Sequence, residues 1–311
     1  MMSSSPLIPK LEKIFSIGPN PHILSQNSVN KRIGWNLAAL LPVWLSGFRV
    51  FAWDAVSIPL MVIVFSVGFE WLFSKWIHKK YMFQNGYTVF LAILFALLLP
   101  PEIPWWAILV GVFFMTIIAK EMFGGLGGNI FNPALIGLAM IMLLFPSYFL
   151  SESGFQRTIQ IFSERFLQAP FRELMFNGRA ELLGEASAIA VIIGGIIMIL
   201  SRTIRWETPL IYLLSAGAGF FLAGEEFMFR TFQTGILFSA FFLVTDSVTT
   251  PITSSARVPF LILCGLLLVI FIQNGLSEVE SVVYSILIGN VLTPLLDAVT
   301  YKNDAISGVV G

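Results

Sequence analysis

The sequence predicts an all-α, polytopic membrane protein with about ten transmembrane helices, some of them broken, arranged as an inverted repeat. Composition is the first reason: 57% of the 311 residues are hydrophobic and 12% are charged, against roughly 25% charged residues in soluble domains. The second is that apolar segments separated by Gly/Pro-rich breaks fill nearly all of the chain from Ile33 to Leu296. The third is that two breaks are rich in polar residues, which lipid cannot satisfy.

Composition also excludes several functional classes. The 18 Lys and Arg residues balance the 18 Asp and Glu residues, and no basic block indicates binding of nucleic acid. One cysteine, Cys264, and two histidines, His22 and His78, leave too little for a disulfide framework, a zinc or iron–sulfur motif or haem ligation. No HExxH or Walker-type pattern indicates hydrolase chemistry. We therefore expect no metal site and no catalytic side chain, and any redox cofactor must be organic.

The apolar segments predict the membrane helices in order. They cover residues 33–52, 57–77, 87–99, 104–119, 132–149, 186–200, 209–223, 232–245, 258–273 and 280–296. Several are shorter than the ~20 residues that a full crossing takes, which indicates half-helices or broken helices. The polar first 32 residues lack the apolar core of a cleavable signal, so we expect the first helix to be retained.

Charge predicts the orientation of these helices. With a cytoplasmic N-terminus, 12 of the 18 basic residues fall on the cytoplasmic side, as the positive-inside rule expects. The chain then divides into a cytoplasmic N-terminal segment (1–32), a five-helix membrane unit (33–149), an extracytoplasmic loop (150–185), a second five-helix unit (186–297) and a cytoplasmic tail (298–311). The charges of the 150–185 loop roughly cancel, so it fits a small amphipathic cap as well as a solvated connector.

Two pairs of segments indicate the internal repeat. Residues 86–104 resemble 233–251 in having a polar entry, an apolar run and a Pro-terminated break, and residues 134–146 resemble 285–297. The copies lie five predicted spans apart, and an odd offset forces them to be inverted. We therefore expect the breaks of the two halves to face each other.

The first break runs from Gly124 to Pro133 and has four glycines in five positions. The backbone must leave the helix there, and Asn132-Pro133 is typical of a helix start whose free N–H groups suit an anionic or carbonyl-bearing ligand. The predicted cofactor-binding residues of this break are Gly124, Gly125, Gly127, Asn129 and Asn132. The alternative is a re-entrant turn whose glycines allow close helix packing. Lys120 and Glu121, just before the break, either pair with each other or mark its cytoplasmic rim.

The second break, residues 245–255, contains seven hydroxyl residues and a carboxylate. Its hydroxyls can satisfy freed backbone groups, bind a heterocycle or replace water around a cation. The candidates for cofactor binding are Thr245, Asp246, Thr249 and Thr250. Arg257 is the expected partner of Asp246, because an intramembrane carboxylate is costly without one. The alternative is a solvated cytoplasmic loop.

Polar residues inside the spans form a further group. Asp246 and Glu70 are the ion-pathway candidates. Asn36, Glu185, Asn290 and Asp297, and Glu70 taken by itself, are more typical of structural hydrogen bonds between helices.

Several motifs, in this order, resemble the family that unites the D subunit of the Rnf electron-transport complex with the B subunit of the sodium-pumping NADH:quinone oxidoreductase. They are Pro19-Asn20-Pro21-His22-Ile23; Leu99-Pro100-Pro101-Glu102 with Pro104-Trp105-Trp106; Lys120 with Phe123 through Ala134; Thr245 through Pro251; Gly184 through Ala188 with Ile193-Gly194-Gly195; and Asn290 with Pro294 through Asp297. Together they span residues 19–297, and the combination is highly specific although each motif alone is weak.

The resemblance implies a ten-helix, inverted-repeat subunit that binds flavin and passes electrons across the bilayer within a larger ion-translocating complex. Family members often attach FMN to a threonine in an outward-facing segment resembling Asp-x-x-Ser/Thr-Gly-Ala-Thr. Here the 150–185 loop offers only Ser153-Gly154-Phe155-Gln156-Arg157-Thr158. Thr158 is therefore the one local candidate for covalent attachment, and non-covalent FMN or riboflavin is the stronger expectation.

The leading hypothesis is thus a flavin-binding subunit of an Rnf-like or Nqr-like complex in the bacterial cytoplasmic (inner) membrane, with both termini cytoplasmic. The absence of an Nqr-type N-terminal extension favours the Rnf branch. Its expected partners are the other subunits, the lipid bilayer and a quinone. The alternatives are a solute or ion channel of similar architecture that has lost its flavin, and a structural scaffold for partner electron carriers.

Overall fold

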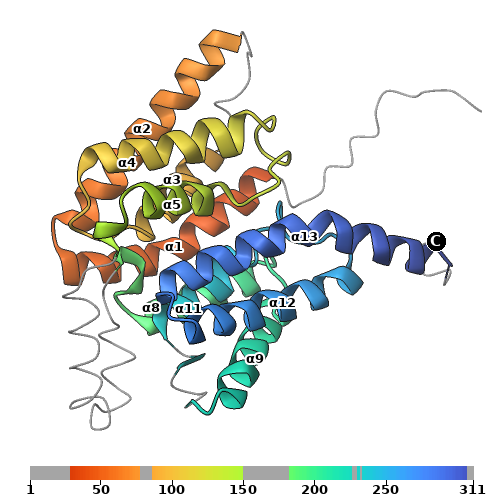
Figure 1. The fold of residues 1–311 in the computed structure, drawn as a ribbon. Helices are drawn as coiled ribbons and strands as arrows, with labels where there is room; N and C mark the ends of the chain where they lie inside the picture. Colours follow the sequence, from red (N-terminus) through yellow and green to blue (C-terminus); the bar gives the residue numbers. More distant parts are fainter. Residues whose placement is uncertain (1–28, 78–85, 150–181, 226–229, 232, 307–311) are drawn as a thin grey trace, which may run out of the picture.

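The computed structural model describes residues 29–77, 86–149, 182–225, 230–231 and 233–306 (Figure 1). Within these ranges the regular structure is entirely helical, with no β-strand. The chain is therefore all-α where it is described, as the sequence predicts. The N-terminal residues 1–28 and most of the predicted extracytoplasmic loop, including Thr158, lie outside the described residues.

Apolar runs form the helices, and their ends follow the predicted boundaries closely. In the first half the elements are α1 (Val29–Phe51), α2 (Asp54–Ile77), α3 (Tyr87–Leu97), α4 (Trp105–Phe113), the π-helical η2 (Phe114–Glu121), α5 (Pro133–Leu144) and the 3-10 turn η3 (Pro146–Tyr148). In the second half they are the 3-10 turn η4 (Leu183–Glu185), α8 (Ala188–Leu200), α9 (Glu207–Leu222), α11 (Thr234–Phe238), the π-helical η5 (Ser239–Leu243), α12 (Ser254–Gln273) and α13 (Glu278–Ile306).

The main difference from the predicted boundaries is at the C-terminus. Helix α13 continues to Ile306, ten residues past the predicted end at 296. The added segment, Asp297 to Ile306, contains no glycine or proline, so nothing in it interrupts helical hydrogen bonding once the apolar run has ended.

Length and hydropathy identify this as a membrane protein. Among the described residues, three helices are long and apolar enough to cross a bilayer: 54–76, 254–273 and 278–300. Shorter apolar helices of 10–17 residues occupy 87–97, 133–144, 188–200, 207–222 and 234–243. Short apolar helices are common where spans are interrupted near a binding site.

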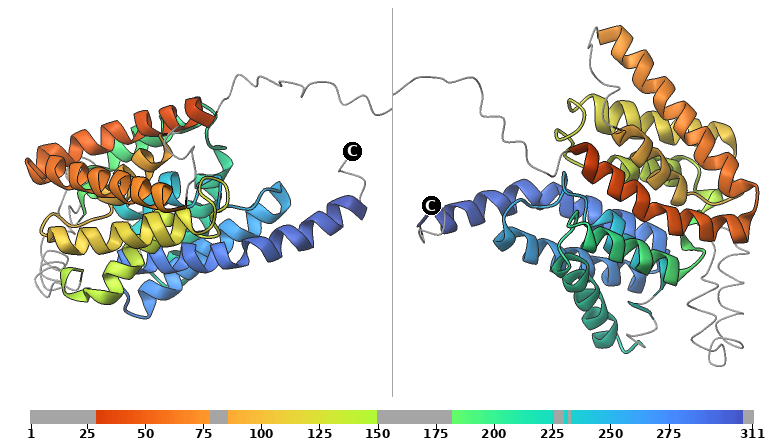
Figure 2. Two further views of the ribbon diagram at one scale, coloured as in Figure 1. Left: turned by 90° about the horizontal axis from the view of Figure 1, so that it is seen from above. Right: turned by 180° about the vertical axis from the view of Figure 1, so that it is seen from behind.

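The two halves of the chain form two adjoining groups of helices (Figure 1). Helix α1 packs against α2 and α3 of its own half and against α8 of the other, and α5 packs against α13. In the second group α12 lies between α9 and α13. Figure 2 shows α13 extending past the other helices toward the C-terminus in both views. Helices α1 and α13 therefore connect the halves.

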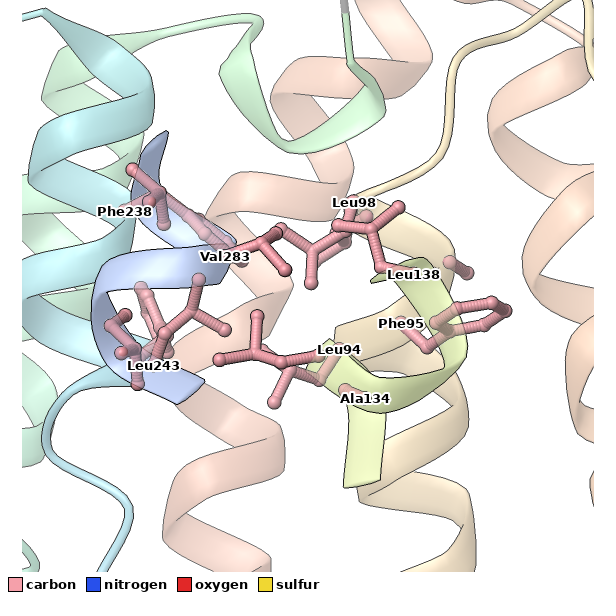
Figure 3. Packing of buried hydrophobic residues seen from close by; sticks show 14 of the residues in the cluster. Leu94, Phe95, Leu98, Ala134, Leu138, Phe238, Leu243 and Val283 are labelled. Atoms are coloured by element: carbon pink, nitrogen blue, oxygen red, sulfur yellow. The ribbon is translucent and has the colours of Figure 1, made fainter. Parts of the chain in front are cut away.

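Apolar side chains fill the region where the two groups meet (Figure 3). We call these residues the apolar barrier: Leu94, Phe95, Leu98, Ala134, Leu138, Phe238, Leu243 and Val283, each at most 5% exposed. In a bilayer such van der Waals packing, more than exclusion of water, holds helices together. Small residues help: a Cβ on Gly137 would lie 2.8 Å from the Gly111 carbonyl oxygen, so only glycine lets α4 and α5 approach this closely.

Both predicted breaks are real, and a π-helical segment precedes each one. Segment η2 ends at Glu121 before the first break and η5 ends at Leu243 before the second. Such π-helical turns are rare and occur frequently at functional sites. Helix α5 then begins where Asn132 accepts a hydrogen bond from the Ala134 N–H at 3.1 Å, with Pro133 at the first helical position. Helix α12 begins where the Thr253 side chain caps the Ala256 N–H.

Candidate functional site

The two breaks meet at one cavity. About 400 Å³ of empty space lies between the N-terminal end of α1, α3, the start of α5, the end of α8 and the second break. Its lining residues are Arg32, Asn36, Phe90, Leu91, Leu94, Asn132, Met198, Thr203, Ile204, Phe242, Thr245, Asp246 and Ser247. We call it the break cavity. The expectation that the breaks face each other across a concavity is therefore confirmed, with Asn132 from one break and residues 245–247 from the other.

Two buried amide atoms at the break cavity have no hydrogen-bond partner. Asn132 uses its Oδ1 to cap α5, which leaves its Nδ2 donor without an acceptor, although the residue is only 1% exposed. On α1, the buried Oδ1 of Asn36 has no donor. A buried polar atom without a partner costs about 1–3 kcal/mol. The break cavity therefore has the character of a binding site for a ligand that supplies both hydrogen-bond donors and acceptors.

Asp246 is held by its own loop. Its Oδ1 accepts from the Val248 N–H at 3.3 Å and its Oδ2 accepts from the Thr249 hydroxyl at 3.2 Å. The predicted pairing with Arg257 is wrong. The Arg257 guanidinium instead donates to the carbonyl oxygens of Pro251 and Ile252.

The threonine hydroxyls of the second break satisfy its backbone. Thr250 Oγ1 donates to the carbonyl of Val244 at 3.0 Å and to that of Asp246 at 2.6 Å, and Thr245 Oγ1 donates to the carbonyl of Phe241. Of the alternatives that the sequence left open, stabilisation of a freed backbone is the one seen for these groups. Thr245 also lines the break cavity, whereas Thr249 and Thr250 do not.

The glycines of the first break form a turn. Gly124, Gly125 and Gly127 have φ angles of 101°, 87° and 94°, which side-chain-bearing residues rarely adopt. A Cβ on any of the three would meet nothing within 4 Å. Close helix packing is therefore not the reason for these glycines. They shape the loop and lie outside the lining of the break cavity.

Asn129, in the first break, contacts α3. Its Nδ2 donates to the Tyr87 hydroxyl at 3.2 Å, and its own Oδ1 is buried without a partner. Tyr87 in turn lies close enough to Asp246 to interact with its charge. No sequence pattern marks Tyr87, Arg32 or Thr203 as site residues, except that each stands at the end of an apolar run.

Glu70 belongs to a separate buried cluster between α2, α3 and η2. The Lys120 ammonium lies 3.2 Å from Glu70 Oε1 and 3.0 Å from Glu121 Oε1, and it donates to the Thr88 hydroxyl at 2.6 Å. Thr88 itself donates to Glu70 Oε2. We call Glu70, Thr88, Lys120 and Glu121 the lysine cluster. Lys120 and Glu121 do pair, as one reading of the sequence allowed, but with Glu70 as a third member.

A second cavity, of about 340 Å³, lies on the other side of the apolar barrier. Its polar residues are Glu185 from η4 and Glu278 from α13, and a Cβ on Gly235 would lie 2.6 Å from Oε1 of each. Glu278 also accepts from the Ile236 N–H at 3.1 Å. The Oε1 atoms of Glu185 and Glu278 thus lie beside Gly235 of α11. Within the described residues, no group of three His, Cys, Asp or Glu side chains converges as metal ligands.

The comparisons with known proteins agree with this geometry. The chain matches the sequence model of the NQR2, RnfD, RnfE family over residues 16–305. It is 31% identical over 298 residues to the D subunit of a Na⁺-translocating ferredoxin:NAD⁺ oxidoreductase complex from Acetobacterium woodii, and the match covers 92% of this chain and 93% of that protein.

Two further relatives come from other organisms. The D subunit of an ion-translocating oxidoreductase complex from Methanosarcina acetivorans is 30% identical over 92% of this chain and 95% of its own length. The B subunit of a Na⁺-translocating NADH-quinone reductase from Azotobacter vinelandii is 28% identical over 89% of this chain and 75% of its own length. Because the family match includes both breaks and nearly the whole chain, this protein belongs to the NQR2, RnfD, RnfE family.

Proposed function

We propose that this chain is the flavin-binding membrane subunit of an Rnf-like, ion-translocating electron-transport complex. Its relatives support the class of assembly, because proteins similar over more than nine-tenths of the chain are named as members of ion-translocating oxidoreductase complexes. Identity alone does not separate the two branches, because relatives named as D subunits range from 26% to 31% and the B-subunit relative is 28% identical.

The flavin proposal depends mainly on the unpartnered amide atoms at the break cavity. Asn132 offers a buried donor, and Asn36 offers a buried acceptor. The pyrimidine edge of an isoalloxazine has a carbonyl, an N–H and a second carbonyl in a row, and it can pair with groups of both kinds. A quinone has only carbonyl acceptors, so it leaves the Asn36 oxygen without a donor, at about 1–3 kcal/mol. Flavin is therefore the better-matched ligand.

The lining of the break cavity also suits a flavin. Phe90, Leu94 and Phe242 provide apolar walls that exclude water from a ring system. When bound, the flavin supplies the one- and two-electron chemistry, while the protein binds and orients it. We propose that FMN or riboflavin is held without a covalent bond.

The lysine cluster supports a role in ion movement for Glu70. Two carboxylates, Glu70 and Glu121, share the Lys120 ammonium, and the three residues are each at most 4% exposed. Ionisable side chains buried within membrane-spanning helices mark ion paths, so Glu70 together with Asp246 remains the proposed ion pathway.

Backbone geometry supports the proposed inverted repeat of about ten spans. Gly124 and Gly275 both have positive φ, at 101° and 90°. They lie 275 − 124 = 151 residues apart, the same offset as that between segments 134–146 and 285–297 (285 − 134 = 151). With the N-terminus in the cytoplasm of a bacterial cell, the break cavity then opens toward the cytoplasmic side of the inner membrane.

A solute or ion channel is the second candidate function. The observation that favours it is a cavity on each side of the apolar barrier. Ion flux into liposomes that contain this chain without its partners, and without bound flavin, would support the channel. A flavin spectrum in the purified chain with no independent flux supports the electron-transfer function.

Asn132→Asp is the direct test of the flavin site. The aspartate keeps the oxygen that caps Ala134 but replaces the Nδ2 donor with a second acceptor. We expect the purified variant complex to remain folded and to lose at least tenfold in flavin affinity, measured by flavin fluorescence after denaturation. Asn274→Asp, on an exposed residue, is the matched control and should keep wild-type flavin content. Folded wild-type protein without flavin absorbance would overturn the proposal.

A further inference from the structure

One face of α13 carries a polar stripe. Asn290, Thr293, Asp297 and Thr300 follow one another at intervals of three or four residues. At 3.6 residues per turn they fall within an arc of about 80° on the helix. Such an alignment on an otherwise apolar helix requires polar partners on the neighbouring elements, because lipid provides none.

The first residue of the stripe contacts the first break. With its amide oriented so that both atoms are satisfied, Asn290 accepts from the backbone N–H of Asn132 at 3.1 Å and donates to the Ile286 carbonyl at 3.3 Å. Asn290 is 1% exposed. The residue that it holds, Asn132, is the one whose free Nδ2 faces the break cavity.

The other three residues contact the second break. Thr293 Oγ1 donates to the Thr249 carbonyl at 3.1 Å. The Asp297 carboxylate accepts from the Ile252 N–H at 3.1 and 3.2 Å and from the Thr253 N–H at 3.3 Å. Thr300 and Thr253 share a hydrogen bond of 2.9 Å between their hydroxyls.

These contacts reach the groups that define the break cavity. Thr249, held by Thr293 through its carbonyl, uses its own hydroxyl to bind Asp246. Asn290 and Thr293 are three residues apart, so the supports of Asn132 and of Asp246 lie within one turn of the same helix. A helix is stiff over one turn, so a displacement of either break is passed to the other through α13.

We infer that α13 fixes the positions of the two breaks relative to each other, with Asn290, Thr293 and Asp297 as positioning residues for the break cavity. We call this arrangement the bracket. This inference depends on the proposed function only for the identity of the ligand in the break cavity. Coupling between the breaks is a property of the protein alone, so it can be present or absent whether or not flavin binds.

Thr293→Val tests the bracket by hydrogen exchange, in the full chain purified within its complex. The change is isosteric and removes only the hydroxyl that binds the second break. We expect amide exchange in residues 249–253 to rise about fivefold, as for the loss of one hydrogen bond. We also expect residues 129–134, in the first break, to exchange at least twofold faster.

Two further variants separate positioning from general destabilisation. Thr293→Ser restores the hydroxyl and should return exchange in both breaks to wild-type rates. Ser285→Ala is the control on the same helix, because that hydroxyl donates only to the Val282 carbonyl within α13. It should leave both breaks unchanged. Faster exchange confined to 249–253 in Thr293→Val, or equal effects of Thr293→Val and Ser285→Ala, would overturn the bracket.

Discussion

Replacing the buried lysine of the lysine cluster is the most demanding test of the structure. Lys120→Met keeps the length and apolar stem of the side chain and removes the ammonium. The ammonium lies 3.2 Å from Glu70 Oε1 and 3.0 Å from Glu121 Oε1. The variant thus leaves two carboxylates, each at most 3% exposed, without that partner.

The expected loss of stability in Lys120→Met follows from the burial of these charged groups. Removing one member of a buried ion pair costs about 3–5 kcal/mol, because the remaining charge has lost both water and partner. Loss of the 2.6 Å bond to Thr88 adds to this cost. At about 2–4 °C per kcal/mol, the unfolding midpoint should fall by roughly 10 °C or more. The triple variant Glu70→Gln/Lys120→Met/Glu121→Gln removes all three charges and should recover at least half of the loss.

The chain contains its own unfolding probe. Cys264 is the single cysteine of the sequence and is fully buried on α12. A thiol-reactive fluorogenic dye therefore reports unfolding when the protein is heated in detergent. Lys75→Met is the control, since Lys75 is exposed on α2 beside the Trp71 ring, and its midpoint should change by less than about 2 °C.

Two outcomes would refute the reasoning about the lysine cluster. One is a Lys120→Met midpoint within about 2 °C of wild type, which means that the ammonium does not compensate buried charge. The other is a triple variant no more stable than the single one. That result shows that lost packing, and not orphaned carboxylates, causes the change.

A further prediction concerns the first break. Gly128→Ala places a Cβ 2.2 Å from the Phe123 carbonyl oxygen and should cost about 1–3 kcal/mol in the same assay. Gly68→Ala, on α2 with open space around it, should change stability by less than about 1 kcal/mol, and equal effects of the two would argue against strain at Gly128.

The helices were predictable because their signal is local. An apolar run of sufficient length in lipid has to form a helix, since no other single segment satisfies its own backbone. The Asn132-Pro133 start of α5 was predictable for a similar reason, as capping depends on residues within one turn. The glycine turn followed from four glycines in five positions, which a continuous helix disfavours.

Side-chain pairings were less predictable because they depend on packing between distant segments. Arg257 lies eleven residues after Asp246 and carries the opposite charge, but the first turn of α12 directs it to the carbonyls of Pro251 and Ile252. Lys120 and Glu70 are fifty residues apart on different elements, and only the packing of η2 against α2 brings them together. Thr203 and Arg32 line the break cavity without any sequence signal of their own.

The sequence by itself determined the membrane class, the order of the helices and the position of both breaks, because each depends on hydropathy or backbone conformation within a short segment. The tertiary structure decided which polar atoms are satisfied and which are left for a ligand. Asn132, Asn36 and Asp246 come from three different elements, and hydrogen-bond satisfaction is a property of the atoms that packing brings within about 3 Å. No pattern along the chain records that proximity.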